Sequence, residues 1–516
     1  MTPTLAAPTK DWQQSLYQHP LVWLLALACA HIAARVLIAD GMKWDESEQI
    51  IWSQQFLLGY GSQPPAYSWL QWGVNQIFGP SVLSLALVKH SLIVLAYVLA
   101  WQAGRVLLPA KGAFWVAGSL LLMLPFGWDS VRDQTHTVLV TAMCFGAWWV
   151  ALRQVQAPAA INFVWLGIFC GFGMLAKYSF ALLIGLFFVA AMSVPQVRRA
   201  LLGRGFWLAP LVGLLIFAPH GYWLLHHWQE ATTETLTKMN ISTQVSHIKG
   251  LGALAKAVFA TLGLWLIVVL ASYRSRLWSP AYRSTPATAP DWRAWAWPLL
   301  GRYLALVFVV LVGMVLVGDV SNFRQRWVLP LTAIAPLALY AWRPALLTDS
   351  VGRGYTWAVL FFAMLFLVLA ALRPWQSDWR GEPDELNHPV TQLAQRLSAA
   401  GYQGRGVILG SDHMVAAMLR SRFPQAQAIA CNPEFSHMAN CIAKARDQAA
   451  QSGAGLLVIA RMDKATPDWW DTVFASLPAV PLQSLAIPYL HMRASTPPMR
   501  YQYLWLPANA VTAPKP

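Results

Sequence analysis

The sequence predicts a polytopic α-helical membrane protein that ends in a small water-soluble α/β domain. Of its 516 residues, 57% are hydrophobic and only 11% are charged, a composition too apolar to cover a water-soluble surface. Apolar runs of roughly 20 residues, the length needed to cross about 30 Å of hydrocarbon, recur over residues 21–375. From residue 376 onward the apolar runs shorten to strand length, which indicates a change of domain.

The apolar runs predict about eleven transmembrane helices. They are expected near 21–39, 82–104, 112–127, 134–152, 161–176, 179–195, 206–224, 253–272, 297–317, 326–343 and 353–372. The stretch 161–195 can also be read as one long helix. Residues 1–20 contain no basic cluster before the first run, so we interpret that run as a retained anchor and 1–20 as a cytoplasmic segment.

The basic residues predict the orientation, because Lys and Arg concentrate in short cytoplasmic loops. With the N-terminus inside, the expected inner loops contain Arg105, Lys111, Arg153, Arg198, Arg199, Arg204, Arg274, Arg276, Arg283, Arg293, Arg343 and Arg353. An odd number of helices then places the C-terminal domain, 376–516, in the periplasm outside a bacterial inner membrane. The net charge of +15 is therefore a topology signal with membrane lipids as partners, and nucleic acid is not an expected partner.

The C-terminal domain alternates strand-like and helix-like segments, which is typical of a small α/β fold. The expected strands are 407–409 and 456–459, and the expected helices are 391–400, 412–421 and 439–451. The domain lacks a Gly-rich phosphate loop. We therefore expect it to help shape a binding site or to bind a partner, without catalysis of its own.

Two cysteines, Cys431 and Cys441, fall in this exported domain. An oxidising compartment permits a disulfide between them. The sequence gives no distance between the two Cβ atoms, so it leaves the pairing open.

The carboxylates of the membrane domain lie mostly on the outer side. Those in external loops or at outer helix ends are Asp40, Asp45, Glu46, Glu48, Asp129, Asp133, Glu230, Glu234 and Asp319. A charge near a bilayer is costly, so carboxylates gathered on one face indicate a functional site. The alternative interpretation is a solvated loop face. The longest external loop, 40–81, also contains apolar stretches that predict helices lying at the membrane surface.

A smaller set of cations lies on the same side, within helices or at their ends. They are Lys89, Arg132, Lys177, Arg324 and Arg326. Cations in such positions need an anion to offset desolvation. They could pair with the carboxylates, or they could hold a phosphate or diphosphate whose hydrophobic tail stays in lipid.

Several of these residues occur in motifs of a known family. Trp44-Asp45-Glu46-Ser47-Glu48, followed by Gln63-Pro64-Pro65-Ala66-Tyr67, resembles the first external loop of the bacterial GT-C-type glycosyltransferases related to protein O-mannosyltransferases and the lipid A aminoarabinose transferase. Gln63 stands where that family often has His. Later segments similar to the family, in the same order, are Trp128 to Asp133, Leu175 to Ser179, Pro219 to Trp223 and Phe323 to Pro330. The resemblance covers about residues 20–345.

The resemblance implies a GT-C-like fold and transfer of a sugar from a polyprenyl-phosphate-linked donor to a lipid, glycan or protein acceptor of the cell envelope, such as lipopolysaccharide. Asp45 would be the general base, assisted by Glu46 or Asp133. Cations would stabilise the departing phosphate. The expected substrate-binding residues are Arg132, Lys177, Tyr178, Arg324, Arg326, Gln63, Tyr67 and His220. Inversion by direct displacement and a covalent route both stay open, as do the donor sugar, the acceptor and the oligomeric state.

No cofactor is assigned, and a divalent metal is left open. Asp45, Glu46, His220, His226 and His227 are suitable ligand types, but they lack a helical or hairpin ligand spacing. The alternative function is a membrane transporter or flippase of lipid-linked sugars. That function predicts mid-helix ionisable residues and an internal repeat, and the sequence shows neither clearly. A non-catalytic scaffold is a third reading.

Overall fold

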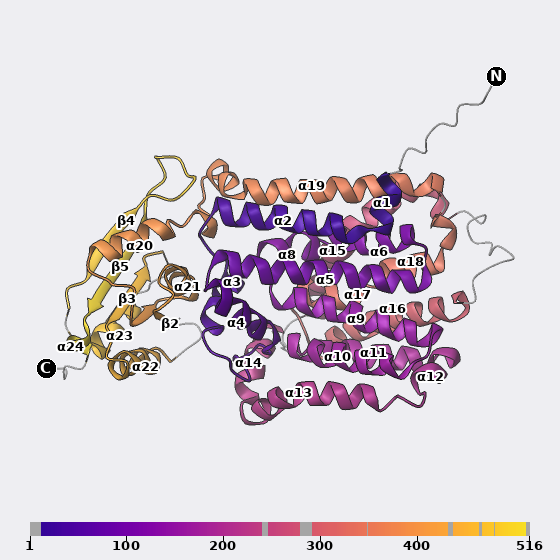
Figure 1. The fold of residues 1–516 in the computed structure, drawn as a ribbon, viewed down its shortest axis with the longest axis horizontal. Helices are drawn as coiled ribbons and strands as arrows, with labels where there is room; N and C mark the ends of the chain where they lie inside the picture. Colours follow the sequence, from indigo (N-terminus) through magenta and orange to yellow (C-terminus); the bar gives the residue numbers. More distant parts are fainter. Residues whose placement is uncertain are drawn as a thin grey trace, which may run out of the picture. The chain divides into compact units, whose positions relative to one another are not determined.

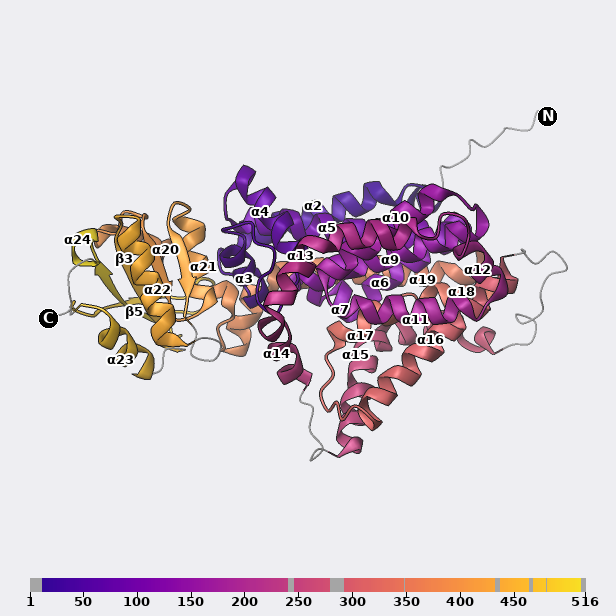
Figure 2. The same cartoon turned by 90° about the horizontal axis from the view of Figure 1, so that it is seen from below.

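The structure is a computed structural model that describes residues 12–239, 246–278, 292–347, 349–431, 437–463, 467–478 and 480–511. The chain forms two compact units. The first unit contains Met1–Cys29, Leu57–Tyr67 and Lys89–Leu367, and the second contains Ala30–Phe56, Ser68–Val88 and Val368–Pro516. Figures 1 and 2 trace the elements of both units, and each unit is described by itself.

The first unit is helical. Its helices are α1 (Trp12–Gln18), α6 (Ala110–Leu122), α7 (Leu124–Gly127), α8 (Asp129–Arg132), α9 (His136–Gln156), α10 (Ala160–Ala176), α11 (Phe180–Met192), α12 (Pro195–Leu201), α13 (Leu208–His226), α14 (Trp228–Met239), α15 (His247–Tyr273), α16 (Arg293–Leu316), α17 (Gln325–Thr332) and α18 (Ala335–Trp342). Four helices contribute residues to both units: α2 (Pro20–Ile38), α4 (Ala66–Phe78), α5 (Val82–Leu107) and α19 (Asp349–Arg380).

Seven of the described helices are long and apolar enough to cross a membrane: α2, α5, α9, α13, α15, α16 and most of α19. Two bent pairs, α6 with α7–α8 and α11 with α12, bring the number to nine if each pair is one span. The multi-pass architecture is therefore confirmed, whereas the number of spans stays a prediction. The expected span 326–343 is divided into α17 and α18, of 8 residues each.

Helix α9 is the interior helix of the first unit, with 89% of its apolar window buried. It packs against α10, which packs on its other side against α13 (Figures 1 and 2). A glycine permits the close approach of α10 to α13, because a Cβ at Gly167 would lie 2.6 Å from the Ala209 carbonyl oxygen. Small residues at helix crossings are typical of membrane bundles, where packing takes the place of the hydrophobic effect.

The second unit contains an α/β domain and the short helix α3 (Trp44–Trp52). The domain's elements are α20 (Val390–Ala399), β1 (Val407–Gly410), α21 (His413–Arg422), β2 (Gln427–Ala430), α22 (Met438–Gln451), β3 (Leu456–Arg461), α23 (Pro467–Ser476), β4 (Gln483–Ile487), β5 (Met499–Leu506) and α24 (Ala508–Val511). The sheet order is β2-β1-β3-β5-β4. Strand β1 pairs in parallel with β2 and β3, and β5 pairs antiparallel with both β3 and β4.

Both faces of this sheet are buried, as the unbroken apolar strands predict. Val407 and Leu409 point into a core formed with α22 and α23. Ile408 points the other way, into a core formed with α20 and α21, because successive side chains of a strand alternate. The result is a three-layer α/β domain (Figure 1), and the expected strands 407–409 and 456–459 are confirmed.

Helix α3 packs on α21 within the second unit. Met42 and Ile50 are fully buried in a cluster with Met418. The side-chain amide of Gln54 covers the edge of β2, because its Nε2 donates to the Ala428 carbonyl oxygen and its Oε1 accepts from the Ala428 N–H, both at 2.8 Å. An exposed strand edge is prone to pair with other chains, and Gln54 occupies part of this one.

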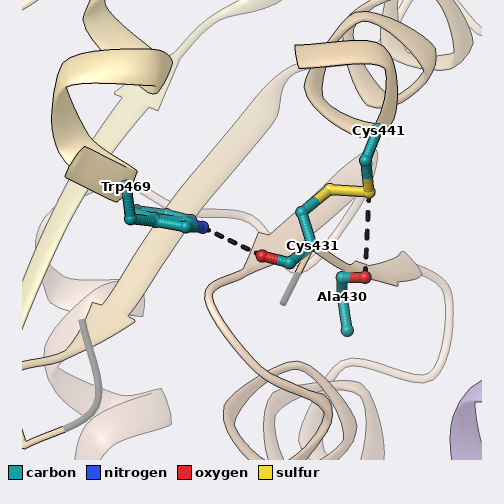
Figure 3. The surroundings of a disulfide bond; sticks show 4 residues. All are labelled: Ala430, Cys431, Cys441 and Trp469. Carbon is teal, nitrogen blue, oxygen red and sulfur yellow. Dashed lines mark hydrogen bonds between the residues drawn. A yellow bond between two sulfur atoms is a disulfide. The ribbon is translucent and has the colours of Figure 1, made fainter. Parts of the chain in front are cut away.

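Cys431 and Cys441 form a disulfide, with their Cα atoms 5.8 Å apart (Figure 3). The bond joins the end of β2 to α22. Cys431 is fully buried, and its carbonyl oxygen accepts a hydrogen bond of 3.0 Å from the indole N–H of Trp469 on α23 (Figure 3). The pairing that the sequence left open is therefore made, and it lies inside the core of the α/β domain.

Replacing both half-cystines with alanine (Cys431→Ala with Cys441→Ala) should destabilise the α/β domain. The bond closes a loop over a sequence separation of 10, and loss of that constraint on the unfolded chain should cost about 2–3 kcal/mol in free energy of unfolding. Thermal unfolding of the full chain in detergent should show a lower Tm for this domain. Cys29→Ala, at an exposed free cysteine, is the control. Equal transitions for all three proteins would contradict the prediction.

Candidate functional site

The predicted general base lies in the first turn of α3. Asp45 is half-buried, and its neighbour Glu46 is 2% exposed. A Glu46 carboxylate oxygen accepts hydrogen bonds from the Arg35 guanidinium at 2.9 Å and from the Lys43 N–H at 3.2 Å. The second bond caps the helix, and a carboxylate at this end also complements the helix dipole. Glu46 therefore fixes the turn that carries Asp45.

A second set of ion pairs holds the residue before α3. The Lys43 ammonium pairs with Glu385 and lies 3.5 Å from a carboxylate oxygen of Asp384. Asp384 also accepts a 2.7 Å bond from Arg373. Burial alone would raise the pKa of Asp384, but its hydrogen bond with Glu385 and the charges of Arg373 and Lys43 outweigh burial and hold that pKa below its ordinary range. The start of α3 is thereby tied to the segment after α19.

In the first unit, two of the predicted cations lie near the N-terminus of α9. Lys177 ends α10, and its ammonium donates to the Thr137 hydroxyl at 3.3 Å. Lys177 and Arg326 both lie close enough to His136 for their charges to act on it. Helix α17, whose second residue is Arg326, packs against α9.

Asp129 links further predicted residues to this place. Arg132 pairs with it at 3.9 Å across one helical turn, and the charges of Asp133 and Arg326 also act on it. The Gln325 side-chain amide donates to its carboxylate. We call Asp129, Arg132, Asp133, His136, Lys177 and Arg326 the α9 cluster. Asp129 was predicted only as one of the outer carboxylates, with no role of its own. His136 and Gln325 were not predicted, although Gln325 stands between two arginines that were.

Tyr178 and His220 pair with each other. The Tyr178 hydroxyl lies 3.0 Å from His220 Nε2, and His220 Nδ1 lies 2.7 Å from the Leu58 carbonyl oxygen. A carbonyl can only accept, so Nδ1 donates to Leu58 and Nε2 accepts from Tyr178. The two rings are stacked, with their centroids 5.8 Å apart. Both nitrogens of His220 are thus engaged, and the bond from Nδ1 anchors the segment Leu57–Tyr67 at Leu58.

The remaining predicted residues lie near these groups. Tyr67 is fully buried, and its ring centroid lies 5.5 Å from that of His136, which brings it to the α9 cluster. Gln63 closes a turn by donating its N–H to the Tyr60 carbonyl oxygen. Arg324 is the N-cap residue of α17. Asp45 and Glu46 belong to the second unit, whereas all the other predicted residues belong to the first.

Within the described ranges, no group of three or more His, Cys, Asp or Glu side chains is arranged to hold a metal ion. His226 and His227 each bond through Nδ1 to the carbonyl oxygen four residues earlier.

Comparison with known proteins finds glycosyltransferases similar to this chain in sequence. Residues 62–223 match the family model of dolichyl-phosphate-mannose-protein mannosyltransferases. The chain is 28% identical over 418 residues to the lipopolysaccharide core galacturonosyltransferase RgtB of Rhizobium johnstonii, covering 78% of this chain and 81% of RgtB. It is 26% identical to RgtA of the same organism, covering 80% and 81%.

Among solved structures, the fold is similar to that of ArnT from Cupriavidus metallidurans, crystallised with undecaprenyl phosphate. The TM-score is 0.58 at 14% identity, and the match covers 96% of this chain and 99% of ArnT. The GT-C-like fold that the external motifs imply is thereby confirmed. The chain is thus similar to protein O-mannosyltransferases over residues 62–223 and to lipopolysaccharide core galacturonosyltransferases over most of its length, and it shares its fold with ArnT.

Proposed function

We propose that this glycosyltransferase takes its sugar from a polyprenyl-phosphate-linked donor and passes it to a glycan or lipid of the cell envelope at the periplasmic membrane face. The observation that carries the proposal is the α9 cluster, which gathers Arg132, Lys177 and Arg326 beside the N-terminus of a helix. The donor phosphate gains negative charge as the glycosidic bond breaks. Cations and a helix N-terminus in a partly dry site stabilise such charge.

Asp45 is the proposed general base. A hydroxyl that attacks the anomeric carbon must pass its proton to a base within hydrogen-bond reach, and Asp45 lies on a turn fixed by Glu46 and Lys43. Glu46 acts by holding this turn, and Asp133 adds negative charge on the side of the α9 cluster. Direct displacement by the activated hydroxyl would invert the anomeric centre.

The other predicted residues contact or position the donor in this proposal. Arg324, preceding α17, adds a further cation near Arg326. Tyr178 and His220 hold the segment Leu57–Tyr67, which carries Gln63 and Tyr67 towards the sugar. The undecaprenyl phosphate bound to ArnT supports a polyprenyl-phosphate carrier. The activity named for RgtA and RgtB supports a hexuronosyl group as the transferred sugar and a lipopolysaccharide core as acceptor.

Two observations support a periplasmic position for the α/β domain in the bacterial inner membrane. The basic residues of the short loops favour a cytoplasmic N-terminus. The disulfide between Cys431 and Cys441 suits an oxidising compartment. Because the named relatives are transferases, we favour transfer over the alternative of a transporter or flippase of lipid-linked sugars.

Asp45→Asn should abolish most transfer, because the amide keeps the shape of the side chain but cannot accept the proton. A loss of a general base typically lowers kcat by roughly 10²–10⁴-fold. Transfer of a labelled sugar from a polyprenyl-phosphate donor to lipopolysaccharide in proteoliposomes measures the effect. The control is Asp471→Asn, at an exposed carboxylate of α23, which should keep the wild-type rate. Equal rates for both variants would rule out Asp45 as the base.

Lys177→Met should slow the chemical step, because it removes a cation from the departing phosphate while keeping the length of the side chain. The expected drop in kcat is about 10²–10³-fold, with partial recovery in Lys177→Arg. Lys249→Met, at an exposed lysine of the same unit, is the matched control. Wild-type kcat and wild-type inhibition by undecaprenyl phosphate in Lys177→Met would show that Lys177 does not contact the donor.

A further inference from the structure

A cleft of about 560 Å³ lies in the second unit at the carboxyl ends of β1 and β3. Ser411 and Asp412 directly follow β1, and Arg461 ends β3. From β1 the chain passes through α21 to β2 on one side, and from β2 through α22 to β3 on the other side of β1. The two connections therefore run in opposite directions across the sheet, and the cleft lies at this topological switch point. Open α/β sheets bind ligands at such points, outside the carboxyl ends of the strands. Its volume is in the range of small-molecule sites, about 300–1,000 Å³.

Buried polar groups line this cleft. Arg461 is 3% exposed, and its Nε lies 3.3 Å from Asp412 and 3.5 Å from Asp463. Its Nη1 donates to His388 Nε2 at 3.2 Å. Burial and the charge of Arg461 lower the pKa of His388 to about 3, so His388 is neutral and accepts this bond. The buried cation therefore has two carboxylate partners of its own, as a charge in such a place requires.

Ser411 supplies a group that a ligand could complete. The residue is 4% exposed and lines the cleft. In the part of the chain that the structure describes, its hydroxyl has no hydrogen-bond partner. Its neighbour Asp412 uses Oδ1 to cap α21, accepting from the N–H groups of Met414 and Val415. A buried hydroxyl without a partner is costly, and it can both donate to and accept from a ligand hydroxyl.

The aromatic rings of Trp44 and Tyr489 line the same cleft. The polar group of each ring already makes a hydrogen bond within the protein. The indole N–H of Trp44 donates to Glu48 at 2.8 Å, and the hydroxyl of Tyr489 donates to the Met499 sulfur at 3.0 Å. Fixed aromatic rings offer apolar surface at little conformational cost. Such surface suits the C–H face of a sugar ring.

The charges that line the cleft nearly balance. The carboxylates are Glu382, Asp384, Glu385, Asp412 and Asp463, and the cations are Arg380 and Arg461. Lys43 and Arg373 do not line the cleft, but they pair with Asp384 and Glu385. With these two cations included, five negative charges face four positive ones. A phosphate would need an excess of cations. Carboxylates beside aromatic rings instead suit hydroxyl groups, which donate to them.

We propose that this cleft binds a neutral, hydroxyl-rich part of a glycan, which is the acceptor of the transfer reaction. Naming the glycan as acceptor rests on the proposed function, whereas glycan binding itself does not. Trp44, which lines the cleft, directly precedes Asp45 on the first turn of α3. A glycan held here therefore lies beside the segment that carries the proposed base.

The test measures binding of core oligosaccharide, released from the bacterium's own lipopolysaccharide by mild acid and then dephosphorylated, to the full chain in detergent by titration calorimetry. Ser411→Ala and Tyr489→Ala should each weaken binding about tenfold or more, and Tyr489→Phe should restore it. Phe474→Ala, at an exposed ring of α23 outside the cleft, is the control. Equal Kd values for all five proteins, or binding of inorganic phosphate alone at this cleft, would overturn the proposal.

A transfer assay separates this proposal from the proposed function. Asp45→Asn should lose transfer but keep the wild-type Kd for the oligosaccharide. Tyr489→Ala should raise the acceptor KM with little change in kcat at saturation. If the cleft variants lose oligosaccharide binding but keep the wild-type acceptor KM, the cleft binds a glycan that is not the acceptor, and that part is overturned. Transfer by Asp45→Asn at the wild-type rate would contradict the assignment of Asp45 as the base, and it would leave the proposal of glycan binding at the cleft intact.

Discussion

A buried charge needs a partner, and this requirement arranges the candidate functional side chains of the protein. Glu46 is almost fully buried, yet it is held by Arg35 and by the start of its own helix. Lys43 is held by Asp384 and Glu385. Breaking a buried pair by removing one partner is far more costly than forming it is favourable. The pairs therefore hold α3, and Asp45 with it, in one position within the second unit.

The same requirement shapes the first unit in a different way. Arg132 and Arg326 lie near the carboxylate of Asp129, and Lys177 and Arg326 lie near His136, the first residue of α9. Arg132 and Arg326 therefore have an anion of the chain beside them, which offsets the cost of desolvating their charges.

Local pattern predicted much of this structure. Unbroken apolar runs at Val407 and Leu456 predicted buried strands, because a parallel strand is covered on both faces. Two expected spans, 112–127 and 326–343, are each divided into two helices, and in each a proline stands in the first turn of the second helix: Pro125 in α7 and Pro336 in α18. The long-range pairs could not be predicted. Lys43 and Glu385 are 342 positions apart, and nothing in the sequence near either one names the other.

The position of the cleft in the α/β domain could have been predicted from the sequence. Ser411, Asp412 and Arg461 stand at the ends of the two best-predicted strands, which is where an α/β sheet places ligands. A Gly-rich loop indicates a phosphate site. Its absence therefore said nothing about this cleft, whose lining has more carboxylates than cations. The fold itself is shared with ArnT at only 14% identity.

We propose that the α9 cluster holds the phosphate of the donor. The most direct measurement is an experimental structure of the full chain with a non-transferable polyprenyl-phosphate-sugar analogue. We predict that the phosphate contacts Lys177 and Arg326. A phosphate bound away from both cations would contradict the proposal.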